Sequence, residues 1–248
     1  MNRVTAKYVA LATTAAFAVS VVGVSAVSAP AGALGASPRS AGSTAAQCKG
    51  TSLKPVVHDD AVRREAKLAT LVADLRARRD PFALNGPQIS ALQGASAGIT
   101  ALDGQIASTC YPTLAALRAD ATKIFVDYRV FWLRGPQTHV IEAADRLDEA
   151  RSRLAEAAGL LAKRVGANAP AQADLAAMDQ ALASADAKLG TPPSAGPSIA
   201  AVAGLQPAAD MSQDTTVLQG AHADLLAARA ALADARADGL KVISDLHA

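Results

Sequence analysis

Residues 136–165, PQTHVIEAADRLDEARSRLAEAAGLLAKRV, place a large apolar side chain at every seventh position from Val140 to Leu161. Alanine occupies the intermediate positions 143, 150 and 157 of the same repeat. A seven-residue apolar repeat is typical of a helix that packs along a coiled-coil seam, and alternating large and small seam residues let the partner helix approach closely. The charged residues between them predict a solvated face made of Glu142, Asp145, Arg146, Asp148, Glu149, Arg151, Arg153 and Glu156.

The chain after this helix repeats the pattern twice. Leucines at 175, 182 and 189 follow a turn at residues 166–170, so we expect residues 136–190 to fold as an antiparallel coiled-coil hairpin. The sequence GTPPSAGP at 190–197 interrupts the pattern and predicts a break. Residues 198–248 then predict a short helix and a long C-terminal helix, which would reach about 50 Å at 1.5 Å per residue.

The part of the chain before the hairpin, residues 59–134, predicts three shorter helices. The first spans about residues 60–79, with Asp59 or Asp60 as an N-cap that accepts a backbone N–H. The second begins after Asn85-Gly86 and the third near Pro112. Glycines at 94, 98 and 104 of the second helix would each cost up to about 1 kcal/mol relative to alanine, which favours a close helix approach there.

The composition agrees with a helical chain throughout. The 248 residues are 51% hydrophobic and only 3% aromatic, and 62 of them are alanine, the strongest helix former. We therefore predict an all-α protein, an elongated antiparallel helical bundle over residues 59–248 with coiled-coil arms and one disulfide.

One segment concentrates the aromatic side chains. Residues 123–139, KIFVDYRVFWLRGPQTH, hold four of the six aromatic residues that follow residue 33. Because these four would point in several directions on a helix, the pattern favours a well-packed part of the core. The alternative is a surface that contacts a ligand or partner through Tyr128, Arg129, Phe131, Trp132 and His139. An extended backbone over 129–133 is a further alternative, since valine, phenylalanine and tryptophan favour strands.

The first 33 residues are typical of a secretory signal peptide. Arg3 and Lys7 precede an apolar stretch at 8–29, and small residues follow it. We expect cleavage after Ala33, with Ala26 as a second possible site and a retained membrane anchor as the alternative. The small, polar residues 34–58 predict a flexible arm, and the whole pattern predicts a secreted or cell-envelope protein without stable membrane insertion after cleavage.

The two cysteines, Cys48 and Cys110, predict one disulfide if the chain is exported to an oxidising environment. The bond would close a loop of about sixty residues and restrict the unfolded chain by about 4 kcal/mol. The alternative is a metal site that joins both cysteines to two of the histidines at 58, 139, 222 and 247, although no CxxC or HxxxH spacing supports it.

The sequence lacks features that are typical of nucleic-acid-binding proteins and of several classes of enzyme. Of 24 basic residues, Arg3 and Lys7 lie in the signal peptide, so residues 34–248 carry 22 basic and 22 acidic side chains. Such a neutral chain lacks the basic surface of nucleic-acid-binding proteins. No GxSxG elbow between a strand and a helix occurs either, because the matching letters GASAG at 94–98 lie within the second predicted helix, and no Walker, GxGxxG, HExxH or EF-hand pattern is found. We therefore expect that the protein has no catalytic residue, no cofactor and no metal, and that it is not an enzyme.

A resemblance to known proteins rests on two segments. Residues 127–147, DYRVFWLRGPQTHVIEAADRL, and residues 198–239 resemble a group of uncharacterised secreted, alanine-rich helical proteins of high-GC Gram-positive bacteria. In that group a Tyr-Arg-Val core precedes a Pro-x-x-His turn, and a Leu-x-Pro-Ala turn precedes a long alanine-rich final helix. The resemblance implies export and a helical fold, and it transfers no catalytic or binding residue.

Three functions remain as hypotheses. The first is an extracellular or cell-envelope interaction or structural protein that binds a protein or a cell-wall component. The second is a module that binds an apolar or aromatic small molecule between helices near residues 128–132. The third is an exported enzyme with an unrecognised site, and the missing motifs disfavour it.

Overall fold

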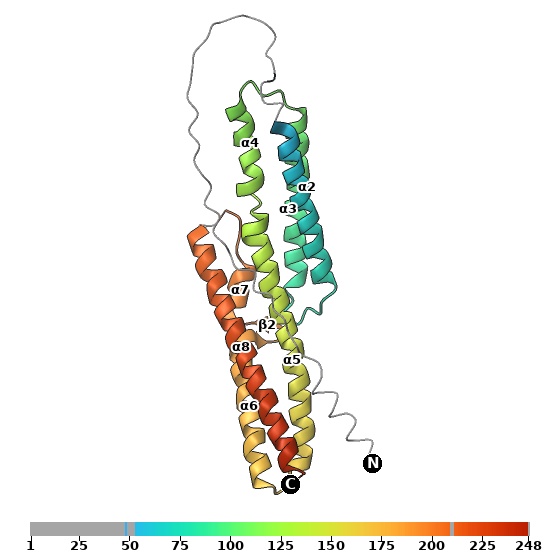
Figure 1. The fold of residues 1–248 in the computed structure, drawn as a ribbon, viewed down its shortest axis with the longest axis vertical. Coiled ribbons are helices and arrows are strands. Elements are labelled where there is room, and N and C mark those ends of the chain that lie inside the picture. Colours follow the sequence, from blue (N-terminus) through green and yellow to red (C-terminus); the bar gives the residue numbers. More distant parts are fainter. Residues whose placement is uncertain (1–47, 49–52, 209–210, 248) are drawn as a thin grey trace, which may run out of the picture. The chain divides into compact units, whose positions relative to one another are not determined.

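The computed structural model of the chain describes residues 48, 53–208 and 211–247. These residues form an antiparallel helical bundle, as predicted (Figure 1). Its elements are α2 (Lys54–Arg76), α3 (Asn85–Ser108), α4 (Leu114–Val126), the π-helix η3 (Val130–Arg134), α5 (Gly135–Val165), α6 (Ala169–Leu189), strands β1 (Gly190–Thr191) and β2 (Ser194–Ala195), α7 (Pro197–Ala203) and α8 (Met211–Asp245).

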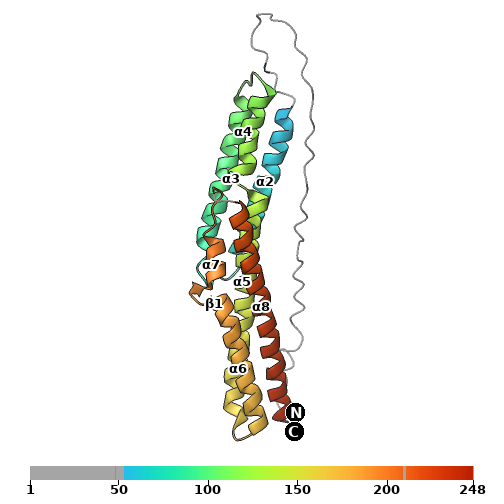
Figure 2. The same ribbon diagram turned by 90° about the vertical axis from the view of Figure 1, so that its left-hand side faces the viewer.

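Helices α5, α6 and α8 pack side by side over much of their length (Figure 2). The large seam residues Leu154, Leu161 and Leu182 are buried in one shared cluster, together with Leu232 of α8. The side-chain amide of Asn168 donates to the carbonyl of Asp245 at 2.9 Å, so the end of α8 lies at the α5–α6 turn. Helix α6 therefore runs antiparallel to both neighbours, and the hairpin and the long final helix form where the repeats predict them.

A second cluster holds α2, α3 and α4 together. Helices α2 and α3 form an antiparallel pair whose buried side chains include Leu68, Leu71, Leu92 and Ile99. Ile141, near the start of α5, is buried in the same cluster. Helix α5 contributes to three hydrophobic clusters in all, two toward its beginning and one toward its end.

Helix α2 begins earlier than predicted. It starts at Lys54 rather than near Asp60, and its N-cap Leu53 makes no side-chain capping bond. Pro55 supplies a helical φ in the first turn, and the ammonium of Lys54 donates to the carbonyls of Ala107 and Thr109 at 2.8 and 2.7 Å. The prediction that residues 54–58 belong to a flexible arm is therefore wrong.

The predicted disulfide joins Cys48 to Cys110, across a sequence separation of 62 residues. It ties the chain before α2 to the connection between α3 and α4. Because both sulfur atoms are bonded to each other, the alternative metal site at these cysteines is wrong. The predicted signal peptide, 1–33, and most of the predicted arm, 34–58, lie outside the described residues.

Of the three glycines singled out in α3, at positions 94, 98 and 104, only Gly98 is tightly packed. A Cβ at Gly98 would overlap the ring of Tyr128, whereas a Cβ at Gly94 or Gly104 would meet nothing within 4 Å. The close approach predicted for this face is therefore made by a tyrosine side chain at one position, and not by a helix at three.

The break at 190–197 is a two-stranded turn. Gly190 pairs with Ala195 and Thr191 with Ser194, around a cis peptide bond between Pro192 and Pro193. Gly190 has φ +90°, and a Cβ there would overlap the backbone of residues 194–196, so only glycine fits. The turn leads into α7, which buries Ile199 and Val202 against α5 and α8.

Candidate interaction surface and the buried polar network beside it

The aromatic side chains between α4 and α5 are largely exposed. Phe125 and Phe131 each have 48% of their surface exposed, and Trp132 has 64%. Val126, next to Phe125, is 55% exposed. We call Phe125, Val126, Phe131 and Trp132 the aromatic face. The prediction that this segment forms the best-packed part of the core is wrong for these residues.

The backbone explains why they point outward. Helix α4 ends at Val126, and Arg129 then adopts a left-handed conformation with φ 43° and ψ 43°. The wide turns of η3 follow, in which the N–H of Arg134 donates to the carbonyl of Arg129 at 3.2 Å. This geometry buries Val130 and Leu133 completely and leaves the two residues between them at the surface. The extended alternative for residues 129–133 is therefore wrong as well.

A buried guanidinium holds two of the rings in place. The guanidinium carbon of Arg64 lies 4.2 Å from the ring centroid of Phe125 and 5.0 Å from that of Phe131. Arg64 is only 5% exposed, and its Nε donates to Asp60 at 2.6 Å. A cation over an aromatic face is attracted by the ring quadrupole. The two rings are thus fixed against α2 although about half of each is open to solvent.

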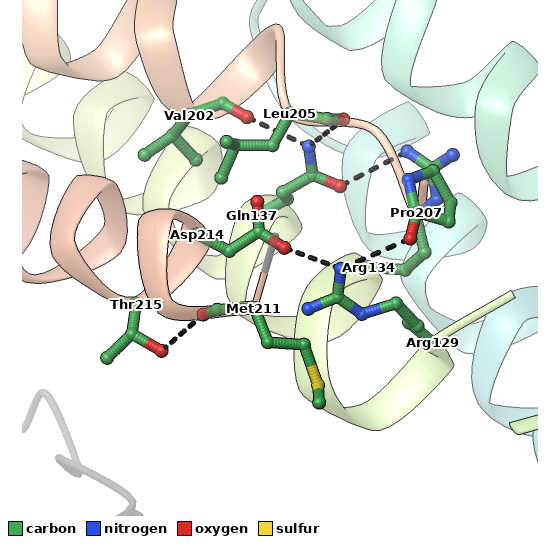
Figure 3. Close-up of polar contacts among 9 residues, drawn as sticks. All are labelled: Arg129, Arg134, Gln137, Val202, Leu205, Pro207, Met211, Asp214 and Thr215. Carbon is green, nitrogen blue, oxygen red and sulfur yellow. Dashed lines mark hydrogen bonds and ion pairs between the residues drawn. The ribbon is translucent and has the colours of Figure 1, made fainter. Parts of the chain in front are cut away.

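A second arginine links the same segment to α8. Arg129 Nη1 lies 2.6 Å from Asp214 Oδ2 and donates to the carbonyl of Pro207 at 3.2 Å (Figure 3). The side chains of the ion pair are 7% and 3% exposed. Because both charged groups are buried, removing either one would leave an uncompensated charge in the protein interior. Arg129 is therefore placed inside the bundle, where it holds the start of α8, and not on the surface.

A third buried arginine continues the network at the start of α5. Arg134 Nη1 donates to the side-chain oxygen of Gln137 at 3.2 Å (Figure 3). The amide nitrogen of Gln137 donates in turn to the carbonyls of Val202 and Leu205 at 2.8 and 2.9 Å. Burial lowers the pKa of Arg134 from its usual value. The backbone that ends α7 is thereby fixed to the first turn of α5.

The structure separates the predicted contact residues into two groups. Phe131 and Trp132 are exposed, and the side chain of His139 is 55% exposed with its Nδ1 3.5 Å from Glu142. Tyr128 is half-buried and Arg129 is buried. Neither Phe125 nor Arg64 is among the contact residues predicted from the sequence. Arg64 lies about sixty residues before Phe125 and Phe131, so no sequence pattern indicates the contact, because the two segments are brought together only by the fold.

The charged face predicted for α5 is buried at its beginning. Glu142, Asp145 and Asp148 are 6%, 4% and 3% exposed, so the prediction of a solvated face is wrong for these three. The N-terminal part of α5 is covered by α2, α7 and α8 on more sides than the single predicted seam. Asp148 is neutralised by Arg151 at 2.7 Å, which also lies 3.0 Å from Asp186.

Asp145 has no such cation. Its Oδ2 accepts a hydrogen bond at 3.2 Å from the amide of Asn85, which also donates to the carbonyl of Arg79. Burial raises the pKa of Asp145 to about 7, and the nearby carboxylates of Asp80, Asp148 and Glu142 act in the same direction. Asp145 therefore changes its charge near neutral pH and connects α5 to the α2–α3 turn.

No group of three or more His, Cys, Asp and Glu side chains within residues 53–208 and 211–247 could hold a metal ion. None of the helices in those ranges is both long and apolar enough to span a membrane.

Comparison with known protein families, with curated proteins and with solved structures finds no match.

Proposed function

We propose that the protein is a non-enzymatic, exported helical-bundle protein that binds a protein or cell-wall component outside the cell through the aromatic face. The observation that carries this proposal is the exposure of Phe125, Phe131 and Trp132 on one short segment. Exposed aromatic residues gathered on one surface are typical of interaction sites, because each ring removes a large apolar area from water when it is covered. Export is supported by the N-terminal segment and by the disulfide.

The supports beneath the surface favour a preformed site. Arg64 holds two of the rings, and Arg129 anchors the left-handed turn between them to Asp214. Side chains that are already ordered lose less conformational entropy on binding. A partner would therefore meet the aromatic face close to its bound arrangement.

A surface contact is favoured over a small-molecule site between the helices. The second hypothesis needs Tyr128 and Arg129 as parts of a binding pocket, but the ring of Tyr128 lies against Gly98 and the guanidinium of Arg129 is paired with Asp214. Phe131 and Trp132, in contrast, are open to solvent. The residues that remain accessible form a face rather than the walls of a cavity.

The test compares capture by two matched variants. The processed protein, with its disulfide intact, is immobilised and exposed to cell-wall fragments and exported proteins of the producing cell. Trp132→Ala is expected to lose the captured component. Leu226→Ala, which removes a leucine that is 49% exposed on α8, is expected to retain it. Equal capture by both variants, or no capture by the unmodified protein, would refute the proposal.

A further inference from the structure

The connection between α2 and α3 contains the longest exposed run in the described part of the chain. Residues 76–80, RARRD, are all exposed, whereas no other exposed run among the described residues is longer than three. Helix α2 ends at Arg76, and Arg79 and Asp80 lie in neither a helix nor a turn. Exposed connections of this kind are the preferred sites of proteolytic cleavage. The backbone at Arg79 and Asp80 is therefore open to a protease.

The arginines of this run indicate the class of protease. They occupy the first, second and fourth positions before the bond between Arg79 and Asp80, at residues 79, 78 and 76. Serine proteases that cleave after arginine hold that side chain in a pocket that contains an aspartate. Further acidic groups of such an enzyme would attract the other two arginines by charge complementarity.

The bond between Arg79 and Asp80 lies beside the buried carboxyl group of Asp145. The side-chain amide nitrogen of Asn85 donates both to the carbonyl of Arg79 and to Oδ2 of Asp145, in each case at 3.2 Å. The nitrogen of Asp80 belongs to the same peptide group as this carbonyl. Cleavage of the bond would turn this nitrogen into an ammonium group close to Asp145.

Asp145 is the carboxyl group of its surroundings that lacks a cation. Asp148 is paired with Arg151 at 2.7 Å, and Glu142 lies 4.0 Å from Arg146. Oδ1 of Asp145, in contrast, is buried and accepts no hydrogen bond from any described residue. Carboxylates on α5 and in the α2–α3 connection raise the pKa of Asp145, so an ammonium group beside it would meet a negative surrounding.

The residues that follow the bond are fixed in place. Oδ1 of Asp80 accepts hydrogen bonds from the backbone N–H groups of Leu84 and Asn85 at 2.8 and 3.1 Å. Phe82 is only 3% exposed and belongs to the same hydrophobic cluster as Val140 of α5. A new N-terminus at Asp80 would therefore stay close to α5 after cleavage.

The disulfide keeps both products of cleavage together. Cys48 precedes the bond between Arg79 and Asp80, and Cys110 follows it. Helix α2 also packs against α3 in their shared hydrophobic cluster. Cleavage would therefore give two chains that are joined by a disulfide, and α2 would keep its neighbour.

We propose that the Arg79–Asp80 bond is a processing site for an arginine-specific serine protease, and that the new ammonium group of Asp80 pairs with the carboxylate of Asp145. The oxygen of a water molecule bonds to the carbonyl carbon of Arg79 as the C–N bond breaks. Both protons of the water end on the nitrogen of Asp80, so the products are a carboxylate and an ammonium group. The new ion pair supplies the cation that Asp145 lacks and ties the α2–α3 connection to α5. None of these residues belongs to the aromatic face, so this inference and the proposed function are tested separately.

Digestion with a serine protease that cleaves after paired arginines tests the site, because the chain contains two such pairs. Arg63 and Arg64 lie inside α2, and Arg64 is only 5% exposed. The folded protein is therefore expected to be cut after Arg79 and not after Arg64, with Asp80 as the new first residue in mass spectrometry. The products should run as one band on a gel without reductant and as two bands after reduction.

Two variants are matched controls for this digestion. Arg79→Gln should lose the cut, whereas Arg153→Gln, which removes an arginine of α5 whose side chain is 69% exposed, should be digested like the unmodified protein. Circular dichroism should show that both variants are folded. A folded protein that is not cut, a first cut at any other bond, or fragments that separate without reductant would overturn the inference.

The pairing is tested by a double-mutant cycle between the cut and Asp145→Asn. Urea unfolding at about pH 7 compares intact and cut protein, with the disulfide formed, for the unmodified chain and for the variant. Loss of the covalent link between α2 and α3 is common to both and cancels in the comparison. Cleavage should lower the folding equilibrium constant at least about tenfold less in the unmodified protein than in the variant, because only the unmodified protein gains an ion pair.

A carboxyl NMR titration gives a second measure of the pairing. The pKa of Asp145 should be lower in the cut protein than in the intact protein, because a nearby ammonium group favours the ionised carboxylate. Equal effects of cleavage on the unmodified chain and on Asp145→Asn, or a pKa of Asp145 that cleavage leaves unchanged, would overturn the pairing.

Discussion

Replacing Asp145 by asparagine is expected to stabilise the bundle above neutral pH. The carboxyl group is 4% exposed, and its pKa is raised from 3.8 in the unfolded chain to about 7 in the folded protein. The folded state therefore holds this proton more tightly than the unfolded state does. The stability that this tighter proton binding gives the folded protein is fully present below pH about 4 and is lost as the pH rises through about 7.

The size of this pH-dependent loss of stability follows from the difference between the pKa values of Asp145 in the unfolded and folded states. Each unit of pKa difference corresponds to about 1.4 kcal/mol, so a difference of about three units gives about 4 kcal/mol of lost stability by pH 8. Asparagine keeps an oxygen that can accept from the amide of Asn85 and carries no charge at any pH. The variant is thus expected to lack this part of the pH dependence.

Urea denaturation followed by circular dichroism at several pH values between about 4 and about 8 measures the difference. The unfolding free energies of the two proteins should be similar at the acidic end and diverge by up to about 4 kcal/mol at the basic end, with the variant the more stable. Glu149→Gln, at a carboxylate whose side chain is 41% exposed, is the control and should follow the unmodified protein. Parallel curves for Asp145→Asn and the unmodified protein would show that the carboxyl group titrates as in water and would refute the reasoning.

Three further results are expected. Asp214→Ala leaves the buried guanidinium of Arg129 without its carboxylate and should cost about 3–5 kcal/mol of unfolding free energy in urea; a loss below about 1 kcal/mol would contradict a buried ion pair. Gly98→Ala should destabilise by about 1–3 kcal/mol because its methyl group overlaps a tyrosine ring, whereas Gly94→Ala should be neutral or stabilising by up to about 1 kcal/mol; equal melting temperatures for the two would rule out the close contact. Mass spectrometry of the exported chain should find Leu34 as its first residue, and an unprocessed N-terminus would refute signal-peptide cleavage.

The helices and their seams could be predicted because burial along a helix is periodic and local. The leucine repeat places Leu154, Leu161 and Leu182 in a shared core without knowledge of which helix lies beside which. The repeat identifies one buried stripe along a helix, however, and does not show how many other helices pack against that helix. Asp145 and Asp148 lie off the seam and are buried because α5 has neighbours on further sides near its beginning.

The candidate surface could be predicted only in part. Composition identified the aromatic segment, and its alternative as a contact surface included the exposed Phe131 and Trp132. It also included Arg129, which is buried. The left-handed residue and the π-helix decide which side chains face outward, and neither has a signature in the residue types that form them. The position of Arg64 between two rings depends on packing between segments about sixty residues apart.

Helix α8 is the last described helix, and it covers the hydrophobic clusters that α5, α6 and α7 leave open. Because synthesis begins at the N-terminus, apolar side chains of α5, α6 and α7 stay uncovered until α8 has been made. A chain that ends before α8 would then expose these apolar side chains to solvent, and exposed apolar surface makes incompletely folded chains prone to aggregation. Shielding of the interior is therefore completed only when α8 has packed against the helices that precede it.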